Sequence, residues 1–195
     1  MKRISIILIF AAVPFISEAQ LSMFNINYSM SVPLGETSDF IGNTSFRGAS
    51  FEGRAFVQDN LSVGGYIGWT VFNETKDGAD YSADGVDVHG TQFRFLNVLP
   101  IQVVTHYYFG TFEGVTPYAG IGVGTTHSLQ RVEIGLVAFE NNNWHLGLSP
   151  ELGVYIPLNY NVGVNIGARY DYAVKSNDST YSNLTFNIGF SFLDY

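Results

Sequence analysis

The chain has 195 residues and a net charge of −8, contains no cysteine, and is 46% hydrophobic. The negative charge argues against a nucleic-acid partner, because such binding depends on neutralising phosphates with Lys and Arg. The lack of cysteine excludes disulfides, a thiol nucleophile and a lipid-anchored N-terminal cysteine. No segment is continuously apolar over the ~20 residues that a spanning helix needs, so any membrane span must be built from strands.

The first 19 residues have the layout of a secretory signal peptide. Two basic residues precede an apolar stretch over residues 4–16, and the small residues Ser17 and Ala19 follow at the positions that a signal peptidase reads. A membrane anchor helix is the alternative, but the apolar stretch is shorter than a bilayer requires. We therefore expect residues 1–19 to be removed and residues 20–195 to form one domain.

The segment from Phe24 to Val32 alternates apolar side chains at even positions with small polar ones at odd positions. Such a strand has one apolar and one polar face. The alternation returns seven more times along the chain. We expect eight strands, over residues 23–32, 48–57, 61–72, 91–109, 115–126, 143–156 and 161–172, and a last one that carries residues 184–192.

The connections between these strands differ in length. Short turns are expected at residues 59–60, 110–114 and 157–160, and longer loops over residues 33–46, 73–90, 127–142 and 173–181. A partly alternating stretch, Val132 to Ile134, predicts a hairpin extension within the third loop. Short periplasmic turns and long external loops are typical of outer-membrane barrels. The predicted fold is all-β, an eight-stranded antiparallel up-and-down transmembrane β-barrel.

Charged residues identify the face that points inward. Those of the strand cores all lie on the polar face, namely Glu52, Arg54, Arg94, Glu151, Arg169 and Asp171. A soluble barrel would carry its charges outside, whereas here the apolar face carries the larger side chains. Glycines share the polar face, and in a narrow lumen they make room for Tyr66, Tyr118, Tyr155 and the arginines. These glycines are Gly64, Gly68, Gly120, Gly122, Gly124, Gly163 and Gly167.

The six charged residues are the candidate site, as a polar network of the lumen. Because unpaired buried charge is costly, they must pair and form hydrogen bonds, which predicts a plugged interior. A charge-lined constriction of an open pore is the rival interpretation. His106 and His145 also lie on the polar face, where membership of this network is favoured over metal binding.

Two further groups of residues could carry other chemistry. His127, Ser128 and Glu140 would suit a lipid A deacylase, but adjacent residues of a strand point to opposite faces. The acidic residues of the second loop could ligate calcium, but their spacing does not match an ordered calcium loop. They are Asp77, Asp80, Asp84 and Asp87, with His89. We expect neither an enzyme, nor a metal site, nor a cofactor.

Four degenerate motifs carry a resemblance to a known family. They are Asp59-Asn60-Leu61-Ser62-Val63-Gly64, Leu99-Pro100-Ile101 with Tyr107-Tyr108-Phe109, Pro117-Tyr118-Ala119-Gly120-Ile121-Gly122-Val123-Gly124, and Gly167-Ala168-Arg169-Tyr170. Through them the chain resembles the OmpA-like, opacity-type outer-membrane β-barrel family over essentially all of residues 20–195. The Ser-Glu-Ala-Gln signal ending is similar to those of exported Bacteroidetes proteins. The chain departs from the family pattern in two ways. Family members usually end on an aromatic residue in phase with the lipid-facing side chains, whereas here that series stops at Phe192. In addition, no wall-binding domain follows the barrel.

The resemblance implies a monomer in the Gram-negative outer membrane, surrounded by lipid and lipopolysaccharide and assembled by the barrel-assembly machinery. The predicted function is that of a non-enzymatic protein that contributes mechanical integrity to the envelope. It presents four external loops to the surroundings, and adhesion or ligand binding through these loops is a subsidiary function. The alternative is a narrow porin-like channel for ions or small solutes. Lipid-modifying catalysis, a third class, lacks its residues.

Overall fold

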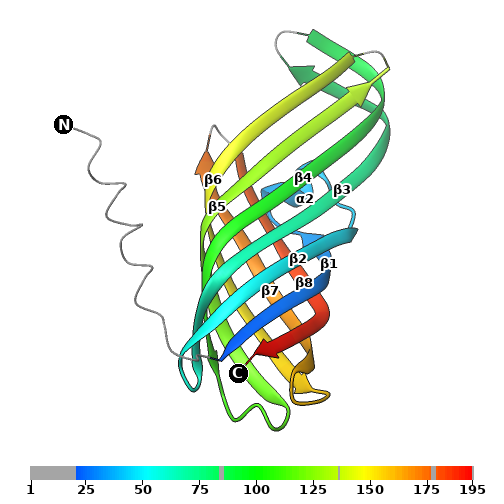
Figure 1. Ribbon diagram of the computed structural model, residues 1–195. Coiled ribbons are helices and arrows are strands. Elements are labelled where there is room, and N and C mark those ends of the chain that lie inside the picture. The colour runs from blue at the N-terminus through cyan, green and yellow to red at the C-terminus, as the bar shows by residue number, and fades with distance from the viewer. Residues whose placement is uncertain (1–20, 84–85, 136, 177–178, 195) are drawn as a thin grey trace, which may run out of the picture.

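The computed structural model describes residues 21–83, 86–135, 137–176 and 179–194, which form a tilted barrel of eight antiparallel strands (Figure 1). The strands are β1 Ser22–Pro33, β2 Ser45–Gln58, β3 Leu61–Ala83, β4 Val86–Tyr108, β5 Thr116–Ile134, β6 Val137–Pro157, β7 Val162–Ser176 and β8 Ser179–Asp194. They pair in chain order, and β8 pairs with β1 to close the sheet, which confirms the predicted fold. The predicted signal peptide lies outside the described residues, among which no helix is long and apolar enough to cross a membrane.

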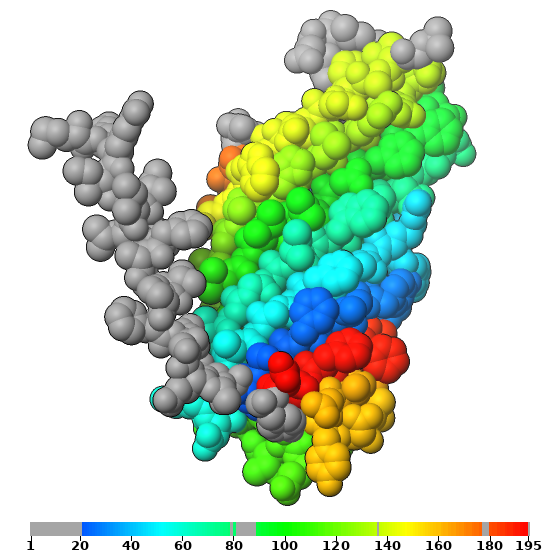
Figure 2. Space-filling view, in the orientation of Figure 1, coloured from blue at the N-terminus to red at the C-terminus, as the bar shows by residue number. Residues whose placement is uncertain are grey.

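The alternation of the sequence becomes two faces of the barrel wall. In β1, Phe24, Ile26 and Tyr28 are 43–47% exposed, whereas Asn25 and Asn27 are at most 3% exposed. Large exposed apolar side chains of the same phase occur on every strand. On the face drawn in Figure 2, the strands lie side by side as continuous diagonal bands. An apolar outside around a polar inside is the arrangement that lipid, rather than water, favours.

The two ends of the barrel differ. At the inner end, short connections join β2 to β3, β4 to β5 and β6 to β7, and β1 begins and β8 ends there (Figure 1). At the opposite, outer end, β1 and β2 are joined by the longest connection, which contains the short helix α2, Glu36–Phe40. The predicted short turns are therefore confirmed.

The prediction of long loops at the outer end is wrong for the second connection. Most of residues 73–90 belong to β3 and β4, which continue to pair there. Their cross-strand partners run from Asn73–Phe95 to Ala83–Val86. Glycine, aspartate and serine indicate a loop in sequence, but here cross-strand pairing satisfies their backbone groups. The expected hairpin extension of the third connection is confirmed, because β5 and β6 pair out to Ile134–Val137. The fourth connection is also shorter than predicted, since β7 and β8 pair out to Ser176–Ser179.

As a result, four strands reach beyond the barrel. The register of β2 with β3 ends at Gly48–Thr70, and that of β6 with β7 begins at Gly147–Ala173. Past these points β3, β4, β5 and β6 continue as one curved sheet, in the upper part of Figure 1. We call residues 71–83, 86–97, 129–134 and 137–146 the projecting sheet.

Candidate functional site: the closed lumen

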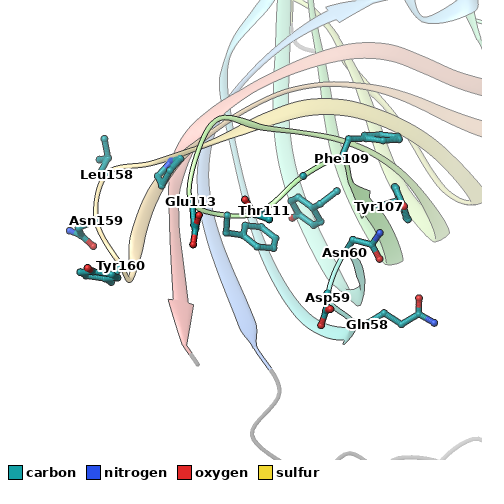
Figure 3. A pocket seen from close by; sticks show the side chains of 14 residues that line it. Gln58, Asp59, Asn60, Tyr107, Phe109, Thr111, Glu113, Leu158, Asn159 and Tyr160 are labelled. Carbon is teal, nitrogen blue, oxygen red and sulfur yellow. The ribbon is translucent and has the colours of Figure 1, made fainter.

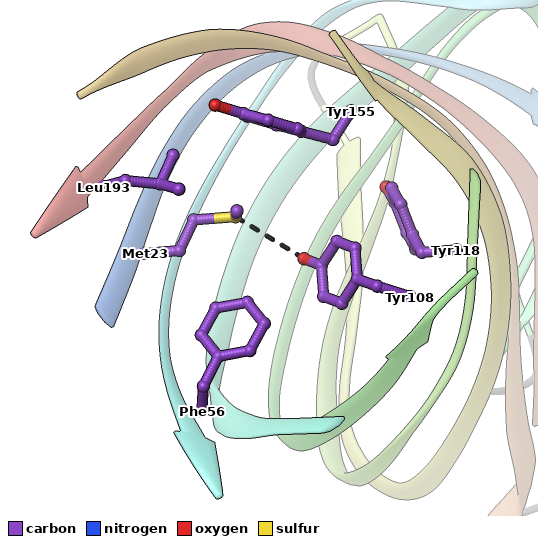
Figure 4. Close-up of a cluster of buried hydrophobic side chains, with 6 residues drawn as sticks. All are labelled: Met23, Phe56, Tyr108, Tyr118, Tyr155 and Leu193. Atoms are coloured by element: carbon purple, nitrogen blue, oxygen red, sulfur yellow. Dashed lines mark hydrogen bonds between the residues drawn. The ribbon is translucent and has the colours of Figure 1, made fainter. Parts of the chain in front are cut away.

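A cluster of apolar and aromatic side chains closes the inner end of the lumen. Its buried members are Met23, Phe56, Tyr108, Tyr118, Tyr155 and Leu193 (Figure 4). Phe112, from the connection between β4 and β5, packs against the cluster, with its ring centroid 5.1 Å from that of Phe56 and 4.9 Å from that of Tyr108. The turn therefore contributes an aromatic ring that closes the base of the barrel.

Above this inner cluster, Glu52 and Arg54 form an ion pair on β2. They are two residues apart and so point to the same side of the wall. Arg54 donates from Nε to Glu52 Oε1 over 2.6 Å and from Nη2 to Oε2 over 2.7 Å. Arg54 also donates to the hydroxyl of Tyr108, and its guanidinium lies 5.2 Å from the ring centroid of Tyr118. Both charges are thus bound in a fork-to-fork geometry.

A second charged group, centred on Arg169, joins β6 and β7. Arg169 Nη1 donates to Glu151 Oε2 over 3.1 Å, and Arg169 Nε donates to Asp171 Oδ1 over 2.9 Å. Arg169 also donates to Gln102, and its guanidinium lies 3.9 Å from the ring centroid of Tyr66. The remaining acceptor positions of the two carboxylates are used as well. Tyr118 donates to Glu151, and Ser149 and Thr185 donate to Asp171.

The structure places five of the six predicted residues in this middle layer of the lumen and Arg94 outside it. Arg94 donates to Gln92 Oε1 and to the backbone carbonyl of Phe40, the latter over 2.8 Å. Within the described ranges Arg94 forms no ion pair. His106, predicted only as a polar neighbour, lies between Glu52 and Glu151, with 3.6 Å from a ring nitrogen to a carboxylate oxygen on each side.

A third layer closes the outer end beneath α2. Its buried apolar residues are Ile41, Phe72, Leu96, Val98, Ala173 and Tyr181. The helix is fixed to β8: the backbone N–H of Ser182 donates to Thr37 Oγ1 over 2.9 Å, and Thr180 donates to Glu36 over the same distance. The sequence pattern missed this layer, because its apolar side chains point into the lumen rather than toward lipid.

Glycines clear the space for the large lumen side chains, as predicted. A Cβ on Gly122 would lie 2.7 Å from Arg169 Nη2, and one on Gly163 would lie 2.3 Å from the ring of Tyr155. Gly153, which was not predicted, does the same for Tyr118 at 2.4 Å. A larger residue at these positions would displace part of the lumen filling.

A groove of about 1260 Å³ lies between the three connections of the inner end (Figure 3). Its lining includes Asp59 from the first connection, Thr111 and Glu113 from the second, and Asn159 and Tyr160 from the third. Phe112 and Tyr108 also line the groove while belonging to the closure of the barrel base. The groove is therefore a surface feature bounded by the inner cluster.

The candidate residues for a lipid A deacylase do not come together. His127 Nε2 lies 2.6 Å from Asn142 Oδ1, and Glu140 pairs with Arg131 over 3.5 Å. Ser128 instead hydrogen-bonds to His145.

The acidic residues of the second connection are distributed along the β3–β4 hairpin. Asp80 pairs with His89 over 2.6 Å, and Asp77 accepts a hydrogen bond from Thr91. Residue Asp84 lies outside the described residues. Within the described part of the chain, no group of three His, Cys, Asp or Glu could hold a metal ion.

An eight-stranded closed barrel with an apolar outer face and a charged, filled interior defines an integral protein of the outer membrane. The chain belongs to the family described as "Outer membrane protein beta-barrel domain", whose model matches residues 8–192. The family and the fold agree on the outer membrane as its location. The predicted OmpA-like character is thus confirmed.

Solved structures share this fold at low sequence identity. Ail, the attachment invasion locus protein of Yersinia pestis, has a TM-score of 0.57 and 15% identity over 90% of this chain and 99% of its own; it was solved in complex with the heparin analogue sucrose octasulfate. The neisserial surface protein NspA has a TM-score of 0.53 and 15% identity over 91% and 97% of the two chains. The N-terminal barrel of Pseudomonas aeruginosa OprF has a TM-score of 0.53 and 12% identity over 90% and 98%. No curated protein sequence matches the chain.

Proposed function

We propose that the protein is a non-enzymatic barrel with a closed lumen that contributes mechanical integrity to the outer membrane. The closure of the lumen at three successive levels carries this proposal. The inner cluster, the charged middle layer and the apolar layer under α2 each consist of side chains that are buried inside the barrel. Filled layers support a bracing role better than a transport role, because an ion would need a continuous polar path.

Planar-bilayer recordings test this closure. We expect no steady conductance from the full-length protein, and none from the variant Arg94→Ala, which leaves the middle layer intact. Steady conductance of the unmodified protein that shifts in Arg94→Ala or Arg169→Ala would overturn the closed lumen and favour the narrow channel. An Arg131→Ala variant is a matched control, because this arginine lies on the projecting sheet and is 45% exposed in its side chain.

The Ser128–His145 pair supports the absence of catalysis. His145 Nδ1 is 3.1 Å from the carbonyl oxygen of Val174, which can only accept, so Nδ1 donates; in a neutral ring Nε2 then accepts from Ser128. Both side chains are buried, and the groove is at the opposite end of the barrel. A catalytic triad would need a carboxylate on Nδ1 and an accessible serine. A fluorophosphonate probe should therefore not label the protein, and labelling that disappears in Ser128→Ala would contradict this.

Surface binding is the subsidiary function, and the projecting sheet supports it because it extends well past the barrel end. Ail, with a similar fold, was crystallised with a sulfated polyanion. The described side chains of the projecting sheet that carry charge at neutral pH are mostly acidic, with Glu74, Asp77, Asp80, Glu133 and Glu140 against Lys76, Arg94 and Arg131. We therefore propose neutral or cationic ligands for this surface rather than a heparin-like one.

Heparin resin and a glycan array that spans neutral, anionic and cationic members test the subsidiary function. We expect no retention on heparin at physiological salt, and array binding that is lost when residues 74–92 are replaced by a short turn. The barrel of this deletion variant should still assemble, since residues 61–73 and 93–108 remain. Retention on heparin, or array binding unchanged by the deletion, would contradict the proposal.

A further inference from the structure

His106 occupies a central position in the lumen. It lies on β4, is 1% exposed, and is enclosed by the charged middle layer. Its Nδ1 is 3.6 Å from Glu52 Oε1, and its Nε2 is 3.6 Å from Glu151 Oε2. Glu52 belongs to β2 and Glu151 to β6, which are not neighbouring strands. The imidazole therefore lies directly between carboxylates of the two charged groups of the lumen.

The two groups do not balance in charge without His106. Their buried carboxylates are Glu52, Glu151 and Asp171, and their buried guanidiniums are Arg54 and Arg169. Three negative charges against two positive ones leave one uncompensated negative charge in a layer that excludes solvent. Burying such a charge without a partner is strongly destabilising, as is removing one partner of a buried ion pair.

The titratable and charged side chains of the layer that encloses His106 come from six of the eight strands, β2 to β7. They are Glu52 and Arg54 from β2, Tyr66 from β3, Tyr108 from β4 itself, Tyr118 from β5, Glu151 from β6, and Arg169 and Asp171 from β7. Tyr118 packs edge-on against the imidazole, with centroids 5.4 Å apart, and its hydroxyl donates to Glu151. Both arginines already bind carboxylates.

His145 provides an internal comparison. It is buried in the same lumen, but its nitrogens contact a serine hydroxyl and a backbone carbonyl, which suit a neutral ring with one N–H. The nitrogens of His106 have no hydrogen-bond partner within the described residues, and each faces a carboxylate instead. A neutral ring would direct a bare lone pair at one of these carboxylates, whereas an imidazolium presents an N–H to both.

We infer that His106 is a further residue of the lumen site, that it carries a proton in the folded barrel, and that it is the third cation that joins Glu52 to Glu151. This inference deepens the proposed closed lumen and rests on it for its functional consequence. The bridge holds the β2 wall to the β6–β7 wall across the lumen. Removing the positive charge while leaving the carboxylates should therefore loosen the closure.

Side-chain nitrogen NMR on the full-length protein, labelled with ¹⁵N-histidine and folded in lipid nanodiscs, tests the protonation state. At pH 7 an exposed histidine is mostly neutral. We expect two protonated ring nitrogens for His106, and one protonated and one bare nitrogen for His145. The variants His106→Gln and His145→Gln assign the signals. A bare nitrogen on His106 at this pH would overturn the inference, whatever the bilayer recordings show for conductance.

Urea unfolding of charge-matched variants gives a second readout. If His106 is cationic, His106→Gln and Glu52→Gln each unbalance the lumen, and each should lower the folding equilibrium constant by at least about tenfold. The double variant is balanced again, so its loss should be smaller than the sum of the two single losses. A neutral His106 predicts the reverse for Glu52→Gln, because that single change would then balance the charges. Strictly additive losses would also contradict the inference.

Discussion

The imidazole of His106 occupies the space that a side chain on Gly120 would need. The two residues are register partners on β4 and β5, and a Cβ on Gly120 would lie 2.1 Å from Cδ2 of the ring. Real Cβ atoms do not approach another atom so closely. The position of the bridging histidine therefore depends on the absence of a side chain on the neighbouring strand.

Gly120→Ala should lower the free energy of unfolding by about 1–3 kcal/mol, because the ring must move out of its place between two carboxylates. Urea titration of the folded protein in detergent measures this change. Gly53→Ala is the matched control, since Gly53 lies on the outer face and an added Cβ would meet nothing within 4 Å. An equal loss in both variants would point to backbone effects and not to displacement of His106.

Arg169→Met should lower the free energy of unfolding by about 3–5 kcal/mol, because it leaves the carboxylates of Glu151 and Asp171 buried without their cation. Arg131→Met removes an exposed arginine that pairs with Glu133 over 2.6 Å, and its expected cost is below about 1 kcal/mol. Both are measured by urea unfolding monitored by tryptophan fluorescence. If Arg169→Met cost no more than Arg131→Met, the middle layer would not be dry and tightly paired.

Val103→Arg tests which face of the barrel meets lipid. Val103 is 65% exposed on the outer wall of β4, with Gly65 and Val123 as register partners. An arginine near the middle of the bilayer costs about 2–4 kcal/mol, so folding into vesicles should weaken by this amount. Thr75→Arg, on the outer end of β3, should fold like the unmodified protein. Equal folding of the two variants would place Val103 outside the membrane.

Ile41→Ala should release the helix α2 from the outer closure. Ile41 directly follows the helix as its C-terminal cap residue and is fully buried, and removing a buried isoleucine side chain costs about 2–5 kcal/mol when the cavity does not collapse. Hydrogen exchange at residues 34–44 should accelerate, while exchange in the inner half of β4 should not. Uniform acceleration along the chain would show that the whole barrel, and not the outer layer alone, depends on Ile41.

Much of this architecture could be predicted from the two-residue period alone. The alternation in β1 and β7 assigns each side chain to a face, and the structure follows it from Phe24 to Val32 and from Val162 to Tyr172. The connections were harder to predict. Residues 73–90 combine turn-forming residue types with strand pairing, and only the facing strand decides between the two.

The sequence pattern predicts which residues of the candidate site point into the lumen, but it does not predict which residues they contact there. The period places Arg54, Arg94 and Arg169 inside, but depth along the barrel depends on the stagger between strands. Arg94 accordingly reaches the backbone of α2 rather than the acids of the middle layer. Leu96 and Val98 point inward, on the same face of β4 as its polar side chains. There they pack against Ile41 in the apolar layer at the outer end. That contact joins segments far apart in sequence.

The seam between β1 and β8 has a consequence for how the barrel forms. It pairs twelve residues of the first strand with residues of the last, from Ser22–Asp194 to Pro33–Asn183, and Ser29 bonds to Asn187 across 158 positions of sequence. Residues so far apart in sequence can pair only after the whole chain between them is present, and such long-range contacts slow folding. The first strand therefore has an unsatisfied edge until β8 has been synthesised and delivered. Completion of the ring is a single late event that protects both edges at once.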